Sequence, residues 1–288
     1  MTTQDILKEL PLIDMIQGYF DRQKSKEASI YQCTNRDTDT LNIYVHGYSA
    51  IGHQKEIEAM MGKIAKIEGG DQWLFVWPSG FILDAFLDDL IPTLKPFIGN
   101  MGVKSSMATD FLSILLPLLS KKALDVINHF KHNQKQAEKF GAEHFFQLLG
   151  QTLADTGKSY QKINLIGHSL GARLIYHAMK NRSINQNYTP KQGFLIDHVI
   201  CLGGAVSISE DWLSVLGGIN GQLRNYYSEN DLALTIKPDT ERCIGQYPIV
   251  LSPKAKTKER DRLVNVKVQY AHTEYWLNID RVMSEINA

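Results

Sequence analysis

One five-residue motif restricts the fold of this chain more than any other feature. Gly167-His168-Ser169-Leu170-Gly171 has the pattern G-x-S-x-G, with a serine between two glycines. A strand-like run, Ile163 to Ile166, precedes the motif, and apolar residues at helical spacing follow it. This context predicts a sharp strand-to-helix turn, where glycines avoid collisions and the serine hydroxyl is lifted above a sheet.

Further strand-like runs alternate with helix-like segments along the chain. The predicted strands cover residues 41–45, 73–77, 162–166, 198–202, 223–227 and 264–270. The predicted helices cover residues 1–28, 56–67, 126–156 and 170–181. Apolar strands alternating with helices predict a mostly parallel central sheet flanked by helices. Together with the G-x-S-x-G turn, this indicates an α/β protein of the α/β-hydrolase fold, as one domain over 1–288 with a helical lid-like insertion at about 81–156.

Composition argues against several other classes of protein. The 288 residues are 43% hydrophobic and 22% charged, which is typical of a globular enzyme. Lys plus Arg and Asp plus Glu each number 31, and zero net charge argues against general nucleic-acid binding. Cys33, Cys201 and Cys243 lie far apart without CxxC spacing, so neither a disulfide framework nor a zinc site is indicated. We expect no metal and no cofactor.

Two features bear on where the protein works. The first residues lack the basic and then apolar pattern of a signal peptide. The longest strongly apolar stretch, 111–120, is shorter than the about 20 residues that a helix needs to cross a bilayer. The expected compartment is therefore the cytoplasm, with leaderless export as an alternative.

The order of residues along the chain predicts the partners of Ser169. In this fold the nucleophilic serine is followed by an acid and then by a histidine. His272 is the histidine beyond the fourth predicted strand, and we expect it to be the general base. Asp231 follows the fifth predicted strand and is the expected acid, which would orient the imidazole. The alternatives to Asp231 are Glu229, Asp239 and Asp211.

Two backbone N–H groups are expected to stabilise the oxyanion of the reaction. The N–H of Leu170 lies at the start of the predicted helix, where donors are unpaired. The loop His46-Gly47-Tyr48-Ser49 follows the first predicted strand and is expected to supply the second donor, from Tyr48 or else from Ser49 or Gly47. A plain turn without a catalytic part is the alternative for this loop. Candidates for substrate contact are Gly47, His168, Phe111 and Leu115.

Several segments together resemble one known family. They are residues 167–173 (Gly-His-Ser-Leu-Gly-Ala-Arg), 136–142, 77–80 and 225–231, with Trp212 and His272 in the same order. The chain is similar to a family of poorly characterised α/β-hydrolase proteins, whose eukaryotic members are described as transmembrane and coiled-coil domain-containing proteins. The resemblance covers about residues 41–280 and implies lipase-like or esterase-like chemistry, often at membranes. This sequence departs from that pattern because it has no long apolar span.

The main functional interpretation is a serine esterase, lipase or phospholipase that cleaves carboxylic esters, most of all lipid acyl esters, through an acyl-enzyme. The expected partners are a lipid or small ester substrate and a peripheral membrane contact. Residues 81–125, including Phe111 and Leu115, are expected either to shape an acyl pocket or to be core helices. The charged run 254–262 is expected to be a solvated loop or a contact for anionic headgroups near the active-site mouth.

Three other functions fit the same sequence. The first is a thioesterase or peptidase on the same triad, because the shape of the pocket decides the substrate. The second is an antibacterial phospholipase delivered by a leaderless secretion machine. The third is a non-catalytic interaction protein that keeps the fold.

Overall fold

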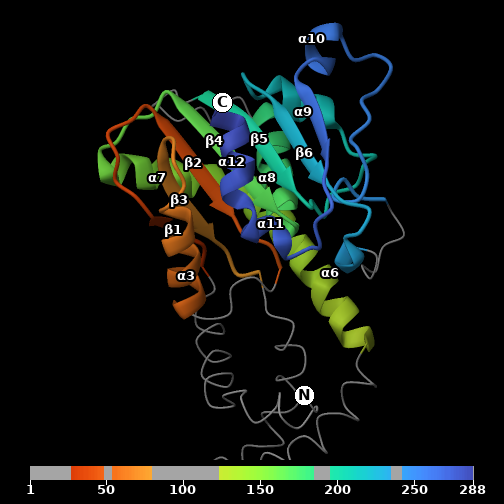
Figure 1. The fold of residues 1–288 in the computed structure, drawn as a ribbon, viewed down its shortest axis with the longest axis horizontal. Helices are drawn as coiled ribbons and strands as arrows, with labels where there is room; N and C mark the ends of the chain where they lie inside the picture. The colour runs from red at the N-terminus through yellow and green to blue at the C-terminus, as the bar shows by residue number, and fades with distance from the viewer. Residues whose placement is uncertain (1–26, 49–53, 80–122, 185–194, 235–241, 288) are drawn as a thin grey trace, which may run out of the picture.

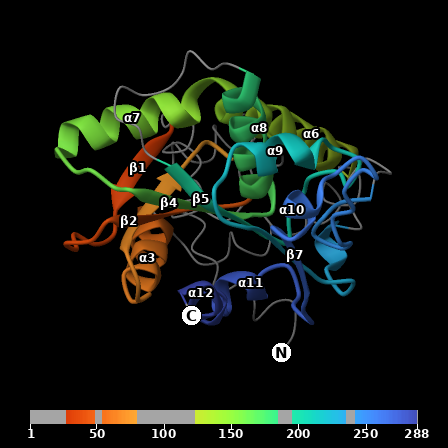
Figure 2. The ribbon, with the colours of Figure 1, turned by 90° about the horizontal axis from the view of Figure 1, so that it is seen from above.

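The computed structural model describes residues 27–48, 54–79, 123–184, 195–234 and 242–287. These residues form a central sheet with helices on both faces (Figures 1 and 2). The strands are β1 (Ser29–Gln32), β2 (Thr40–Val45), β3 (Asp71–Val76), β4 (Lys162–His168), β5 (Leu195–Leu202), β6 (Leu223–Tyr227) and β7 (Leu263–Lys267). The helices are α3 (Gln54–Ile64), α6 (Ala123–Lys139), α7 (Phe145–Thr156), α8 (Leu170–Ile184), α9 (Trp212–Gly217), α10 (Thr257–Arg260), α11 (Glu274–Leu277) and α12 (Ile279–Asn287).

The strands follow the order β1-β3-β2-β4-β5-β6-β7 across the sheet. β1 runs antiparallel to β3, and every other neighbouring pair is parallel. The chain thus has the predicted α/β-hydrolase fold, with β4 in the middle of the sheet. Because the parallel strands point the same way, the loops that follow β2, β4, β6 and β7 all leave from one edge, which we call the carboxyl edge.

Each face of the sheet carries its own hydrophobic core. On β2, Leu41, Ile43 and Val45 are fully buried in the core that includes α7, α8 and α9. Tyr44 lies between them in sequence and is buried in the other core, with α3, α11 and α12. Figure 2 shows these two groups of helices on opposite sides of the sheet. The alternation follows from the two-residue period of a strand, and burial on both faces explains why the strands read as continuous apolar runs.

The predicted helix 126–156 is α6 and α7, joined by a π-helical segment, Phe140–His144. Gly141 in this segment packs so closely on α8 that a Cβ atom there would lie 2.2 Å from the carbonyl oxygen of Leu174. Within the predicted insertion, α6 and the π-helical segment thus pack against α8, and α7 contacts β1. Residues 81–122 lie outside the described residues, and their role as a lid stays a prediction.

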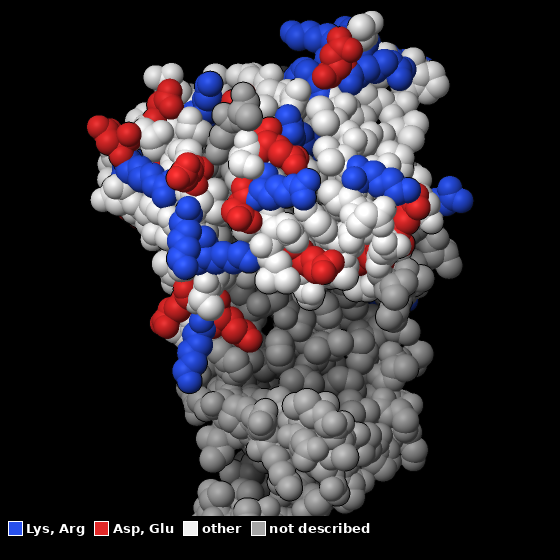
Figure 3. Space-filling model, in the orientation of Figure 1, with Lys and Arg blue, Asp and Glu red and all other residues white. Residues whose placement is uncertain are grey.

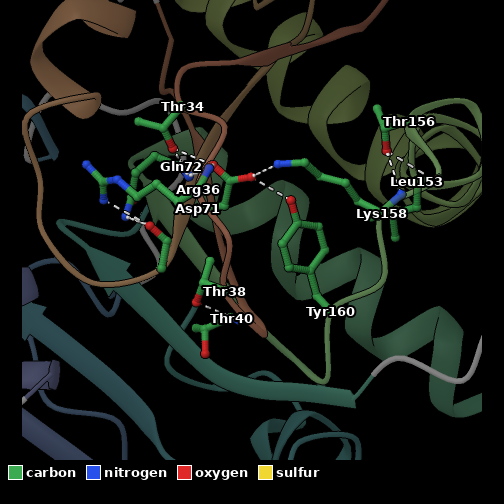
Figure 4. A network of polar contacts seen from close by, with 11 residues as sticks. Thr34, Arg36, Thr38, Thr40, Asp71, Gln72, Leu153, Thr156, Lys158 and Tyr160 are labelled. Carbon is green, nitrogen blue, oxygen red and sulfur yellow. Dashed lines mark hydrogen bonds and ion pairs between the residues drawn. The ribbon is translucent and has the colours of Figure 1, made fainter.

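A buried carboxylate at the start of β3 joins several segments of the chain (Figure 4). Lys158 Nζ and Tyr160 Oη donate to Asp71 Oδ2 at 2.5 and 2.6 Å, and the hydroxyl of Thr34 donates to Oδ1. Burial alone would raise the pKa of Asp71, but these hydrogen bonds outweigh it and hold the pKa below its ordinary value. The group lies at the amino end of β3, so it stabilises the edge of the sheet opposite to the carboxyl edge.

The charged run 254–262 also lies at that opposite edge. It contains α10 and leads directly into β7, whereas Ser169 follows the carboxyl end of β4. In Figure 1, α10 stands at one extreme of the molecule, and Figure 3 shows basic side chains there with acidic ones among them. The hypothesis that this run contacts headgroups near the active-site mouth is therefore wrong, because the whole length of the sheet separates the two.

Candidate active site

Ser169 occupies the turn between β4 and α8, as the motif predicts. Its φ of 54° is the only positive φ of a non-glycine residue in the described part of the chain. Such a conformation is strained and persists only where surrounding contacts impose it. Here the Ser169 N–H donates to the carbonyl of Leu202, and the Ser169 carbonyl accepts from the N–H groups of Ala172 and Ala205, at 3.0 to 3.1 Å.

The two glycines of the motif are required by close contacts. A Cβ atom on Gly171 would lie 2.2 Å from the carbonyl oxygen of Val45, and one on Gly167 would lie 2.7 Å from Cα of Ala172. Both contacts are with backbone atoms, which cannot move aside as a flexible side chain can. The turn thus brings α8 directly against the end of β2, where the predicted oxyanion loop begins.

Asp231 and His272 come together at the carboxyl edge from loops that follow β6 and β7. His272 Nδ1 lies 2.7 Å from Asp231 Oδ2, and because an ionised carboxylate can only accept, the proton belongs to Nδ1 of the imidazole. The Asp231 side chain is fully buried, whereas that of His272 is 20% exposed. This leaves Nε2 of His272 as the nitrogen that can accept a proton.

Two of the three alternative acids make other contacts in the described residues. Glu229 forms an exposed ion pair with Lys267, at 2.9 Å. Asp211 caps the first turn of α9 by accepting from the N–H of Ser214. Asp239 lies outside the described residues. Among the described candidates, Asp231 is therefore the acid that contacts His272.

His168 lies under the loop that carries His272. Its Nδ1 accepts from the indole N–H of Trp276 at 3.1 Å, and its Nε2–H donates to the His272 carbonyl at 2.8 Å. Both ring nitrogens are thus engaged within the protein. Burial, followed by the nearby charge of His272, holds the pKa of His168 well below its ordinary value, so the ring is neutral. His168, a candidate for substrate contact, contacts the loop that carries His272, and its role in substrate contact stays a prediction.

The loop after β2 lies directly against the nucleophile. A Cβ atom on Gly47 would lie 2.7 Å from Cβ of Ser169, so the structure brings together these two predicted residues. Leu170 is fully buried as the first residue of α8, where backbone N–H groups have no partner within the helix. The Tyr48 side chain turns towards α6, where its hydroxyl is 2.8 Å from His129 Nδ1.

His46 fixes the orientation of this loop. The Trp77 N–H donates to His46 Nε2 at 3.3 Å, so the ring proton lies on Nδ1, which donates to the Gly47 carbonyl at 2.9 Å. In a trans peptide the C=O and the next N–H point in opposite directions. The contact on Gly47 therefore sets the direction of the Tyr48 N–H. Burial lowers the pKa of His46 to about 4.

Comparison with known proteins places the chain in a family. A family model described as "protein of unknown function (DUF726)" matches residues 21–287. The chain belongs to the DUF726 family. An "uncharacterized membrane protein" of Caenorhabditis elegans is 22% identical to this DUF726 protein over 255 residues, which are 87% of this chain and 38% of the relative. The chain thus spans well under half of that relative's length.

Solved structures that resemble this DUF726 protein include esterases and a thioesterase. Esterase PE8 has a TM-score of 0.43 at 13% identity, with 91% of this chain and 97% of that one covered. The carboxylesterase EstE1 from a metagenomic library has a TM-score of 0.42 at 10% identity, with coverages of 97% and 96%. The type II thioesterase BorB of the borrelidin biosynthetic cluster has a TM-score of 0.39 at 9% identity, with coverages of 90% and 96%. The strand order and the turn at Ser169 define the fold of this DUF726 protein.

Two candidates for substrate contact in this DUF726 protein, Phe111 and Leu115, lie outside the described residues. Sequence reasoning did not assign roles to His46 or Trp276, both of which bind the predicted catalytic loops. The role of His46 could have been predicted from its position directly before Gly47. No rule of sequence spacing connects Trp276 to His168, so that contact could not have been predicted. In the described stretches, no helix is both long enough and apolar enough to cross a membrane.

Proposed function

We propose that this chain is a serine hydrolase that cleaves carboxylic esters. The observation that supports this most strongly is the contact between His272 and buried Asp231, at the same edge of the sheet as the strained Ser169. An acid, a base and a nucleophile in this arrangement make up the machinery of acyl transfer. A buried carboxylate facing an imidazole also stabilises the imidazolium form that the reaction requires.

In the proposed reaction, Ser169 Oγ attacks the ester carbonyl while its proton passes to His272 Nε2. The N–H groups of Leu170 and Tyr48 stabilise the resulting oxyanion. His272 then gives the proton to the departing alcohol, which leaves an acyl group on Ser169. Water, deprotonated by His272, attacks this acyl-enzyme and releases the acid, and the proton returns to Ser169.

The contacts of the described residues include no hydrogen bond between the Ser169 hydroxyl and His272. Catalytic hydrogen bonds often form or shorten only once the substrate is bound. We therefore expect the two side chains to approach each other in the substrate complex.

For the substrate, we propose a lipid acyl ester. Residues 81–125 follow β3 in the sequence, extend into the start of α6 and are mainly apolar. This composition supports a lipid acyl ester, since apolar pockets bind acyl chains. The name of the Caenorhabditis elegans relative, a membrane protein, agrees with a lipid substrate. A preference for long over short acyl chains is the property that this proposal predicts.

Active-site labelling and hydrolysis of p-nitrophenyl esters of graded acyl length test the proposal together. We expect a fluorophosphonate probe to label the wild type, and Ser169→Ala to abolish both labelling and hydrolysis. Ser284→Ala changes an exposed serine on α12 and is the matched control, expected to leave both intact. Labelling that survives in Ser169→Ala, or a wild type that neither labels nor turns over any ester, would contradict a serine hydrolase. A short-chain preference would contradict the lipid substrate alone.

A further inference from the structure

We propose that His168 and Trp276 are positioning residues that hold the general base His272 against the nucleophile turn. The inference rests on the proposed function, because it assigns a role relative to His272 as the base. His168 directly precedes Ser169, and Trp276, on α11, lies four residues after His272. The two side chains therefore connect the segment that carries the nucleophile to the segment that carries the base.

The hydrogen bonds have only one consistent assignment of protons. The indole N–H of Trp276 can only donate, so His168 Nδ1 must be the acceptor. A neutral imidazole with an acceptor at Nδ1 carries its proton at Nε2, and that N–H donates to the carbonyl of His272. Trp276 thus selects the tautomer of His168 that can bind the His272 backbone. In the other tautomer, an Nε2 lone pair would face the carbonyl oxygen, which is repulsive.

This arrangement restrains His272 at three points. Asp231 holds Nδ1 of the imidazole, and His168 holds the carbonyl. The His168 ring also lies beside the His272 ring, with centroids 4.7 Å apart and an interplanar angle of 43°. The ring of Tyr275 packs on the His168 ring at 5.9 Å. Rotation of the His272 ring about its side-chain bonds would break the Asp231 contact, and a shift of the loop would break the His168 contact.

A purely space-filling role does not account for these contacts. Two fully buried tryptophans, Trp73 and Trp212, have indole N–H groups without a hydrogen-bond partner, whereas Trp276 is only half-buried. The fold therefore accommodates tryptophan without using its N–H, whereas Trp276 directs its N–H to a single nitrogen of His168. An apolar residue at position 168 would fill the same space and would not bury ring nitrogens that need hydrogen-bond partners.

Three substitutions separate positioning from packing. His168→Leu removes both hydrogen bonds, Trp276→Phe keeps an aromatic ring but removes the donor, and His168→Gln keeps one acceptor and one donor. Because a misplacement of about 1 Å can cost 10²-fold, we expect kcat to fall about 100-fold in His168→Leu and about 10-fold in Trp276→Phe, with KM within about three-fold. His168→Gln should recover at least about 10-fold of the loss, because it can bridge the same two groups.

Matched controls use a histidine and a tryptophan elsewhere in the fold. His198→Gln changes a β5 histidine whose Nδ1 accepts from the N–H of Gln222, and Trp212→Phe changes a buried tryptophan without an N–H partner. Both should lower the melting temperature without changing kcat. The rate of fluorophosphonate labelling at Ser169 is measured for each variant beside the melting temperature, so that a folding defect is distinguished from a misplaced base.

The results separate this inference from the proposed function. If the wild type labels and His168→Leu labels at the same rate while remaining folded, the positioning role is overturned and the serine hydrolase proposal stands. If the wild type does not label at all, the proposed function itself fails. If His168→Leu does not fold, Trp276→Phe and His168→Gln decide, since Trp276 is only half-buried and glutamine is a polar side chain close in size to histidine. Equal kcat in wild type and Trp276→Phe would overturn the role of Trp276.

Discussion

Gly47 and Ser169 lie so close that a methyl group on Gly47 would come within 2.7 Å of Ser169 Cβ. Gly47→Ala must therefore displace either the oxyanion loop or the nucleophile turn. We expect kcat for ester hydrolysis to fall about 10²-fold or more, because the loss of one oxyanion donor alone has that effect. Gly62→Ala, on α3, meets no atom within 4 Å and should leave activity unchanged. Full activity in Gly47→Ala would contradict the placement of the loop.

Replacing the acid should affect catalysis far more than folding. In Asp231→Asn the amide can donate to His272 Nδ1, and this favours the imidazole tautomer that carries its proton on Nε2. In that tautomer Nε2 cannot accept the proton of Ser169. We expect kcat to fall by about 10⁴, the effect that an equivalent change has in a well-characterised triad. Unfolding in urea should show little loss of stability. Glu229→Gln, two residues away, is the control, and an effect of equal size there would exclude Asp231 as the acid.

Protonation of buried histidines should make the fold sensitive to moderate acid. Burial lowers the pKa of His46 to about 4 from its ordinary value of 6.5. Between these two pH values the histidine is protonated in the unfolded chain but neutral in the folded chain. This stabilisation is complete above pH 6.5 and is lost as the pH falls to about 4. It amounts to on the order of 3 kcal/mol for His46, and His168 contributes in the same direction.

Urea unfolding between pH 7.5 and pH 4.5 measures this effect. His46→Gln should reduce the dependence of the free energy of unfolding on pH, whatever it does to the stability at pH 7.5. His132→Gln changes an exposed histidine on α6 and should leave the dependence as it is in the wild type. An equal slope in wild type and His46→Gln would show that His46 does not remain neutral in the fold.

The carboxylate network at the other edge of the sheet should contribute to stability but not to catalysis. Asp71→Asn leaves Lys158 without its buried partner, and breaking a buried ion pair costs on the order of 3 kcal/mol. Because the pKa of Asp71 is lowered, its stabilisation is present above about pH 4 and is lost as the pH falls further. We expect a lower melting temperature with unchanged kcat. A selective loss of kcat would contradict the separation of the two edges.

The parallel strands were predictable from sequence because burial on both faces makes them continuous apolar runs. Their observed positions agree with the predicted ones to within three residues. β1 was not predicted, since Ser29–Gln32 has four residues and gains its strand character from pairing with β3. The π-helical segment Phe140–His144 was also not predicted, because helical periodicity alone does not reveal one extra residue per turn.

Chain order predicted Asp231 as the acid and His272 as the base, and the structure brings these two residues into contact. Order could do so because the connections of this fold place those loops at one edge of the sheet. It could not identify the contact between His168 and Trp276, which are 108 residues apart. That contact depends on how α11 packs after β7, and no local pattern encodes such packing. The contact between the candidate acid and base was therefore predictable from sequence, but the contacts that His168 and Trp276 make around it were not.

The position of α10 has a practical use. Lys254, Lys256 and Lys258 are exposed around it, at the end of the sheet remote from Ser169. Attachment to a sensor chip or bead through an affinity tag inserted beside these lysines would orient the carboxyl edge away from the support. The edge that carries α10 would also accept a fluorophore or an affinity handle in the 252–258 loop, without contact with the proposed catalytic residues.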